Sequence, residues 1–210
     1  MAGHAAKPAN RKVGILVFAF VALFGAMVAW PYLPFGQTPA AAQSASAEIP
    51  ADAPVATMVL ESGEVTIALR PDLAPEHVAR ITELANSGFY DGLKFHRVIE
   101  GFMAQTGDPL GNGTGGSDLP DLAAEFTNAS FVRGTVGMAR SANPDSANSQ
   151  FFIVTADAPH LNGQYTLFGN VISGMELIDG LEKGPASVNG TVANPDIMVS
   201  LRVAEPTTQQ

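Results

Sequence analysis

The sequence predicts a mainly β-protein, a closed antiparallel β-barrel capped by two helices and preceded by one N-terminal transmembrane helix. Three features of the 210 residues support this fold class. Short apolar runs of the strand type recur in the C-terminal three quarters and are joined by glycine-rich connections. Two segments, far apart in the sequence, have a helical pattern instead. A long uncharged run lies near the N-terminus.

The uncharged run extends from Val13 to Trp30 and directly follows Arg11 and Lys12. Eighteen helical residues span about 27 Å, close to the hydrocarbon core of a bilayer at about 30 Å. Trp30 and Tyr32 stand where an interfacial aromatic belt is expected, and the two cations mark the cytoplasmic end. The run therefore indicates a membrane-spanning helix.

This topology divides the chain into four parts. We expect a cytoplasmic basic tail at residues 1–12, a single-pass signal-anchor in the inner membrane at 13–35, and a flexible Ala/Pro/Ser-rich linker at 36–56. Residues 57–205 then form the globular domain on the periplasmic side. A cleaved signal peptide is the alternative, because small-residue cleavage sites follow the run, and it would leave the domain periplasmic or secreted.

A hairpin and a helix open the predicted domain. Residues 57–61 and 64–69 alternate in polarity around a Ser-Gly turn, which indicates two antiparallel strands. The helix begins at Pro75 and ends near Gly88, following the usual preference for Pro at the start and Gly at the end. Its apolar face is expected to carry Val78, Ile81, Leu84 and Ala85.

The remaining predicted strands are short and end at turns that contain Gly or Pro. They cover residues 95–105 with a turn at 100–101, then 134–139, 150–154, 167–171, and 192–203 around a turn at 194–196. A second helix is expected at residues 175–182. Many short strands with two separate helices indicate a closed barrel with helices over its ends.

Composition excludes several function classes. From Glu48 onward, eight Lys and Arg residues face twenty acidic ones, a net charge of −12 that repels nucleic acid. The absence of cysteine excludes disulfides, cysteine-ligated metals and a thiol nucleophile. Residues 111–116 match the dinucleotide-binding glycine pattern, but no apolar helix or βαβ unit surrounds them. We therefore interpret that segment as a turn-rich loop.

Five motifs follow one another within the predicted domain. They are FHRVIEGFMAQTGD at 95–108, GNGTGG at 111–116, MARS at 138–141, SQFFI at 149–153 and FG at 168–169. Their order and spacing resemble those of the cyclophilins, a family of peptidyl-prolyl cis-trans isomerases, over about residues 57–203. The resemblance implies an eight-stranded barrel with a groove that binds proline-containing peptides and rotates the bond before proline.

The resemblance also implies individual site residues. Arg97 is similar to the catalytic arginine, and Gln105 to the side chain that binds the substrate backbone. Arg140, His160 and Tyr165 stand where many members carry Asn, Trp and His, and these variants resemble bacterial cyclophilins. The implied substrate-binding set is Phe102, Met103, Gln105, Gly113, Ala139, Arg140, Gln150, Phe152, His160, Leu161 and Tyr165.

The chemistry of the reaction explains these residue types. Twisting a peptide bond breaks its resonance, at a barrier of about 18–20 kcal/mol, and leaves a lone pair on nitrogen. A fixed donor such as Arg97 binds that nitrogen more strongly in the transition state than in the ground state, so no metal or cofactor is implied. His96 is expected to be structural, because neighbouring side chains on an extended chain point to opposite sides.

Two functions remain in competition at this stage. The first is a peptidyl-prolyl isomerase that assists folding of exported proteins, since uncatalysed isomerisation takes tens of seconds or longer. The second is a non-catalytic binding module or holdase that grips proline-containing segments in the same groove. Arg97 favours the enzyme. The expected partners are proline-containing peptide segments and, through residues 13–35, the membrane; we expect a monomer and no nucleic acid.

Overall fold

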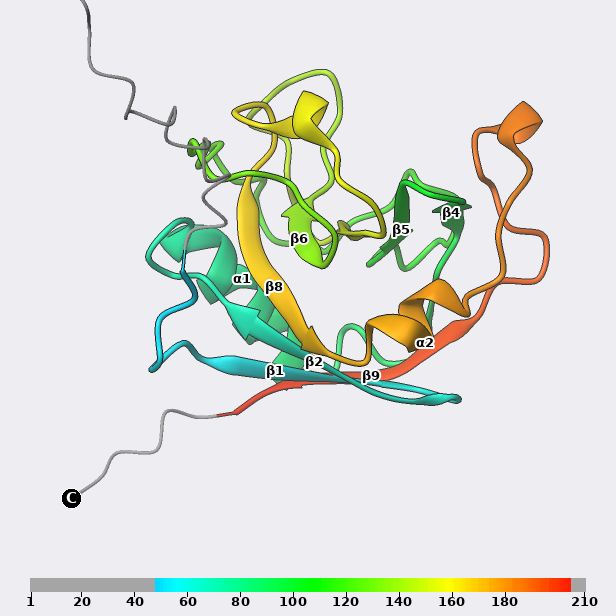
Figure 1. Ribbon diagram of the computed structural model, residues 1–210, viewed down its shortest axis with the longest axis horizontal. Helices are drawn as coiled ribbons and strands as arrows, with labels where there is room; N and C mark the ends of the chain where they lie inside the picture. Colours follow the sequence, from blue (N-terminus) through cyan, green and yellow to red (C-terminus); the bar gives the residue numbers. More distant parts are fainter. Residues whose placement is uncertain (1–47, 205–210) are drawn as a thin grey trace, which may run out of the picture. The chain divides into compact units, whose positions relative to one another are not determined.

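The computed structural model describes residues 48–204, which form one strongly curled antiparallel sheet with two α-helices (Figure 1). The order of strands across the sheet is β3-β9-β1-β2-β8-β6-β7-β5-β4. The strands are β1 (Val55–Leu60), β2 (Gly63–Leu69), β3 (Leu93–Lys94), β4 (Arg97–Ile99), β5 (Met103–Thr106), β6 (Thr135–Met138), β7 (Phe151–Val154), β8 (Leu167–Ser173) and β9 (Ile197–Val203).

The helices are placed near the sheet and differ in length. They are α1 (Pro75–Asn86), α2 (Met175–Asp179) and two 3₁₀ turns, η1 (Pro159–Leu161) and η2 (Ala186–Val188). The predicted helix starts are confirmed, although α2 ends three residues before the predicted Glu182. The β1–β2 hairpin is also confirmed, with β1 beginning two residues before the predicted strand.

A side chain distant in sequence completes the N-terminus of α1. Ala74 stands at the N-cap and has no capping side chain. The Glu125 carboxylate instead accepts hydrogen bonds from the backbone N–H groups of Glu76 and His77, at 3.2 and 3.0 Å. A carboxylate at this end of a helix satisfies unpaired N–H groups and is favoured by the helix dipole. Glu125 therefore fixes the long loop that contains it against α1.

The sheet separates two hydrophobic cores, and β7 contributes to both. All four β7 side chains are buried. Phe151 and Ile153 belong to the larger core, which also contains the apolar face of α1, whereas Phe152 and Val154 belong to the smaller one. This division follows from the alternation of side chains along a strand. The smaller core lies directly beneath the functional site described below.

The strand count differs from the predicted eight. The segment predicted at 95–105 with a turn at 100–101 forms β4 and β5 with a turn between them, as expected, and the preceding residues form the separate short strand β3. The strand assignment is interrupted at Phe95 and His96, whose side chains are both buried, at 0% and 5% exposure. β3 and β4 are the two ends of the described sheet. The described residues thus form a curled nine-stranded sheet rather than the expected closed eight-stranded barrel.

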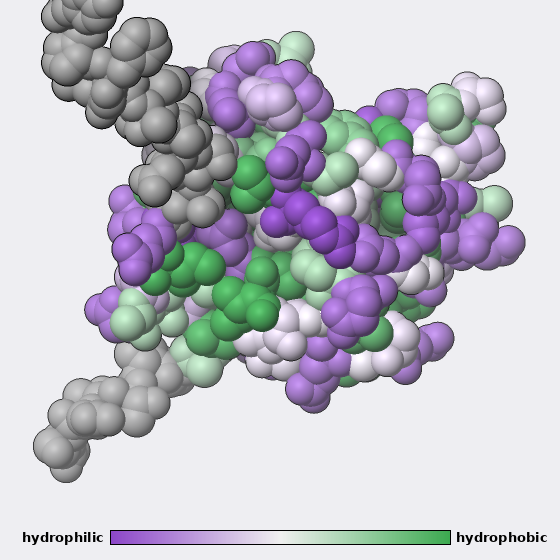
Figure 2. Space-filling model, viewed as in Figure 1, coloured by the Kyte–Doolittle hydropathy of each residue, from purple (hydrophilic) through white to green (hydrophobic). Residues whose placement is uncertain are grey.

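Hydrophobic and hydrophilic residues are distributed unevenly over the face seen in Figure 2. Hydrophobic residues gather over β1, β2 and β8, and hydrophilic residues cover the surrounding loops. Among residues 48–204 no helix is long and apolar enough to cross a bilayer. The predicted basic tail and anchor at 1–12 and 13–35 lie outside the described residues, as does most of the predicted linker at 36–56.

Candidate active site

The candidate site is built on one row of residues that crosses four strands. Arg97 on β4 lies opposite Gln105 on β5, Gln105 lies opposite Phe152 on β7, and Phe152 lies opposite Gly137 on β6. Residues opposite each other in antiparallel strands project to the same face with Cβ atoms about 5 Å apart. The sheet register therefore brings a cation, an amide and an aromatic ring together on one surface.

Gly137 has no side chain, and the rings of Phe131 and Phe152 occupy the space that a side chain would need. A Cβ atom at this position would lie 2.7 Å from Phe131 and 2.8 Å from Phe152. The rings of Phe131 and Phe152 stack with centroids 6.0 Å apart, and Tyr165 meets Phe152 edge-on at 5.7 Å. With Met103 on the neighbouring strand, these rings form a rigid apolar floor for the site.

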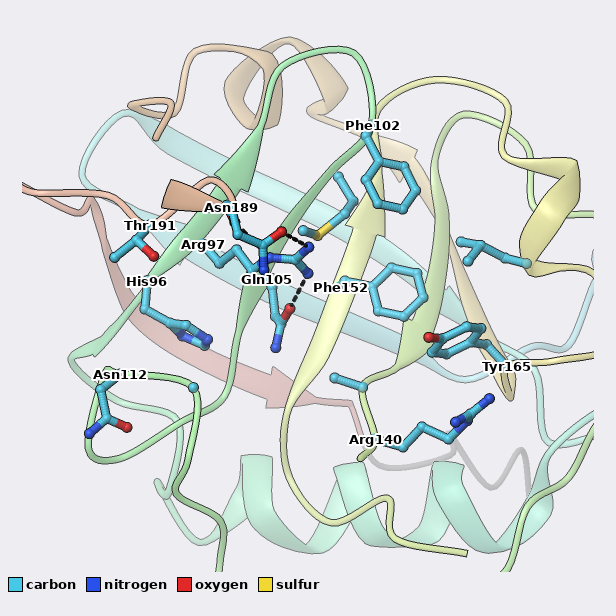
Figure 3. Close-up of a pocket in the computed structure, with 14 residues that line it drawn as sticks. His96, Arg97, Phe102, Gln105, Asn112, Arg140, Phe152, Tyr165, Asn189 and Thr191 are labelled. Atoms are coloured by element: carbon cyan, nitrogen blue, oxygen red, sulfur yellow. Dashed lines mark hydrogen bonds between the residues drawn. The ribbon is translucent and has the colours of Figure 1, made fainter. Parts of the chain in front are cut away.

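The guanidinium of Arg97 is held by three hydrogen bonds, which fix its position at the edge of this floor (Figure 3). Nε donates to the backbone oxygen of Asn189 at 3.0 Å, and Nη2 donates to its side-chain Oδ1 at 3.0 Å. Nη1 donates to Oε1 of Gln105 at 3.1 Å. Burial lowers the pKa of Arg97 from its ordinary value, yet a guanidinium stays protonated in proteins. Two of its five N–H donors remain for a ligand.

Gln105 connects the arginine to the glycine-rich loop. Its Nε2 donates to Oε1 of Gln150 at 2.9 Å, and Nε2 of Gln150 donates to the backbone oxygen of Gly115 at 2.8 Å. This chain fixes which way the Gln105 amide points, with its oxygen toward Arg97. Its second N–H donor is then directed away from Gln150.

The buried carboxylate of Asp108 orders the glycine-rich loop itself. It accepts hydrogen bonds from the backbone N–H groups of Leu110, Asn112 and Gly113, at 2.8, 2.9 and 2.5 Å. Burial alone would raise the pKa of Asp108, but these backbone donors, together with that of Gly115, lower it below the ordinary value of 3.8. The loop is therefore held in place by a charged group that does not face the ligand.

These elements enclose a pocket of about 410 Å³. The structure brings most of the predicted site residues to it, namely Arg97, Phe102, Met103, Gln105, Gly113, Ala139, Arg140, Phe152, Leu161 and Tyr165. A second pocket of about 440 Å³ adjoins it and shares Gln105, Gly113, Ala139 and Arg140.

Two predicted substrate-binding residues do not line the first pocket. Gln150 lies under the adjoining pocket, where it supports Gln105 and Gly115. His160 is exposed on η1, with its ring centroid 5.3 Å from that of Phe102. The 3₁₀ turn directs Leu161 into the pocket and leaves the preceding histidine at its rim.

Four further residues line the pocket without having been predicted as site residues: His96, Asn112, Asn189 and Thr191. The expectation that His96 points away from Arg97 was wrong, because His96 lies outside β4 and strand alternation does not apply to it. Burial lowers the pKa of His96 from its ordinary value of 6.5, although Asp108 and the Lys94 backbone oppose the shift. His96 is therefore neutral near pH 7.

Asn189 is the most important pocket residue that the sequence did not predict. It ends η2 in the left-handed conformation (φ 55°) and meets Arg97 across 92 residues of sequence. The Asn-Gly pair at 189–190 indicates a turn, since both residues tolerate positive φ. Nothing in the sequence indicated that the turn would reach Arg97.

The fold and site together define a class of protein. An apolar pocket faced by a fixed guanidinium, with the Gln105 amide beside it, is suited to binding a peptide and acting on it without a nucleophile. Residues 55–203 match the family model described as cyclophilin type peptidyl-prolyl cis-trans isomerase. The chain belongs to this family.

Individual relatives agree with this assignment. The chain is 53% identical over 178 residues to a probable peptidyl-prolyl cis-trans isomerase of Brucella suis, covering 80% of this chain and 90% of that protein. It is 45% identical to peptidyl-prolyl cis-trans isomerase B of Bacillus subtilis, covering 60% of this chain and 89% of that protein. The enzyme is thus a cyclophilin-type peptidyl-prolyl cis-trans isomerase.

Solved structures show the same fold. A Cryptosporidium parvum cyclophilin, crystallised in the presence of the dipeptide Ala-Pro, is 26% identical with a TM-score of 0.66 and covers 72% of this chain and 99% of that one. The cyclophilin AquaCyp293 from Hirschia baltica is 25% identical with a TM-score of 0.63 and covers 74% of both chains.

Proposed function

We propose that this isomerase acts through Arg97, whose free N–H donors bind the nitrogen of the twisted X–Pro bond. The observation that carries this role is the position of the guanidinium, which is held by Gln105 and Asn189 beside the apolar floor. A donor that is already fixed in position costs no reorganisation when the lone pair develops on nitrogen. The interaction is therefore strongest in the transition state, as catalysis requires.

The apolar pocket holds the proline ring while the acyl side of the bond turns. Phe102, Met103, Phe152 and Leu161 form its walls, and their packing against the smaller core keeps them rigid. Exclusion of water favours rotation, because water stabilises the planar, dipolar amide. The solved relative crystallised in the presence of Ala-Pro supports a proline-containing ligand for this pocket.

Several groups must share the catalytic effect. A hydrogen bond to a charged group contributes about 1.5–3 kcal/mol, whereas a 10⁵-fold acceleration needs about 7 kcal/mol. Arg97 alone is insufficient. Gln105 supplies a further donor for the substrate backbone, because one of its two amide N–H groups is not used by Gln150.

We propose further that the enzyme assists folding of exported proteins from the periplasmic face of the inner membrane. The uncharged run at 13–35 after a basic tail supports an anchor, and the acidic domain that follows contains no cysteine. The mass of the mature protein recovered from a membrane fraction distinguishes the anchored from the cleaved form. Protease accessibility of the domain in intact spheroplasts tests its side of the membrane.

The test of the catalytic role compares the full chain, purified in detergent, with its Arg97→Ala variant on an X–Pro peptide. NMR exchange between cis and trans peptide gives the rate directly. We expect a loss of at least 100-fold in kcat/KM, about 2.7 kcal/mol. The matched control is Arg202→Ala, which removes an arginine that pairs with Asp91 away from the pocket. Equal rates for the wild type and Arg97→Ala would instead favour a non-catalytic binding module.

A further inference from the structure

The two adjoining pockets form a groove that carries positive charge, although the domain as a whole is acidic. Of the residues that line the first pocket, two are arginines, Arg97 and Arg140, and none is Asp or Glu. In residues 48–204, three other arginines have a carboxylate within 4 Å, in the pairs Arg70–Asp72, Arg133–Asp179 and Arg202–Asp91. The two groove arginines form no such ion pair within that range. Their charge is available to a ligand.

Arg140 is the one charged residue that lines both pockets. The second pocket has a single acidic lining residue, Asp121. The guanidinium of Arg140 lies 4.5 Å from the ring centroid of Tyr165, which provides a flat support. Nε and Nη2 donate to the backbone oxygen of Gln164, and Nη1 donates to that of Ser141. These bonds use three of the five N–H donors of Arg140. Because the acceptors are uncharged backbone oxygens, they do not neutralise the positive charge of the guanidinium.

The geometry separates this arginine from the catalytic one. Figure 3 shows Arg140 beside Tyr165, with the Phe152 ring between this pair and Arg97. A peptide whose proline occupies the floor at Phe152 can therefore meet Arg97 at the reacting bond and Arg140 with a flanking residue. A stacked guanidinium with free donors is a preferred partner for a carboxylate.

We infer that Arg140 is a specificity-determining residue, which makes the groove prefer proline segments that carry Asp or Glu near the proline. This inference rests on the proposed function of the groove. An exposed ion pair of this kind corresponds to about a two- to fivefold preference, and a well-oriented one to more. The preference should fall at high salt, since screening shortens the Debye length from about 10 Å at 0.1 M to about 3 Å at 1 M.

The test uses the peptide Ala-Ala-Ala-Pro-Ala-Ala and variants with Glu, Gln or Lys at one position before or after proline. Dissociation constants for the full chain in detergent come from NMR titration, so the result does not depend on turnover. We expect Glu to bind about two- to fivefold more tightly than Gln in at least one position, and Lys more weakly than Gln.

The variant Arg140→Gln should reduce the Glu/Gln ratio to about one, whereas Arg140→Lys should keep the direction of the preference. The matched control Arg202→Gln also removes a positive charge, but outside the groove, and should leave the ratio unchanged. Equal affinities for Glu and Gln peptides in the wild type would overturn the inference, as would a ratio that persists in Arg140→Gln. Isomerisation rates of the same peptides test the proposed function separately. If the protein binds the peptides with the predicted preference but does not accelerate isomerisation, the proposed catalysis is refuted and the inference on Arg140 stands.

Discussion

Replacing Asn189 by Gly should weaken catalysis while leaving the fold intact. Asn189 holds Arg97 twice, through its backbone oxygen and through its side-chain Oδ1. Glycine removes only the side-chain bond, because it adopts the left-handed conformation at φ 55° without strain and keeps the backbone oxygen in place. The variant therefore isolates one contact to the Arg97 guanidinium.

The magnitude follows from the environment of that bond. Hydrogen bonds to charged groups contribute about 1.5–3 kcal/mol, but Asn189 is exposed, so water competes for the donor. A loss of about 1 kcal/mol of transition-state stabilisation is the appropriate value, and it corresponds to about a fivefold lower kcat/KM. The loss should fall on kcat and leave KM nearly unchanged, since the bond positions Arg97 and does not bind substrate.

NMR exchange and line-shape measurements on an X–Pro peptide provide kcat and KM, and the Nε–H resonance of Arg97 reports whether its environment changes. Asn189→Ala should lose the same activity and about 1 kcal/mol of additional stability, because alanine is strained in the left-handed region. Asn128→Gly, another exposed loop asparagine that does not line the pocket, is the matched control. Wild-type kcat for Asn189→Gly, together with a shifted Arg97 resonance, would refute the positioning role.

Three further substitutions test the supporting structure. Gly137→Ala should lower peptide affinity about tenfold and stability by about 1–3 kcal/mol, because its Cβ would overlap Phe131 and Phe152; unchanged affinity in an NMR titration would contradict this. Asp108→Asn should lose about 2–3 kcal/mol at pH 7, measured by urea unfolding. The folded-state pKa of Asp108 is lowered, so its stabilisation is complete above pH about 4 and is lost as the pH falls further; the difference from wild type should shrink there. Glu125→Gln should cost about 0.5–2 kcal/mol through the N-terminus of α1, with kcat/KM unchanged.

Local patterns predicted the regular elements of the domain well. The β1–β2 hairpin and α1 begin and end within about two residues of the predicted limits, because turn residues and the helix preference for proline act over short distances. The strand break before Arg97 was not predictable in this way. Phe95 enters the larger core, whereas the consecutive residues His96 and Arg97 both line the pocket, so alternation fails between these two, which is a tertiary effect.

The site residues also divide into those that local sequence predicted and those that depend on tertiary contacts. Arg97, Gln105 and Phe152 stand in motifs that resemble those of a known family, and the structure brings all three to one pocket. Asn189 and Thr191 stand in no such motif and reach the pocket through a loop that packs against β4 only in the folded protein. Local sequence carries no information on such contacts, because they depend on how distant segments meet.

The two parts of the groove differ in what would disturb them. The row Arg97–Gln105–Phe152–Gly137 depends on sheet register, and a slip of one residue in any strand would turn its side chain to the opposite face. The residues that hold or surround this row, Asn189 and Arg140, lie on connections outside the strands, where substitutions change contacts without changing register. We therefore expect changes at Arg140 to alter which peptides are preferred while rotation chemistry persists, and changes in the row to remove catalysis for every peptide.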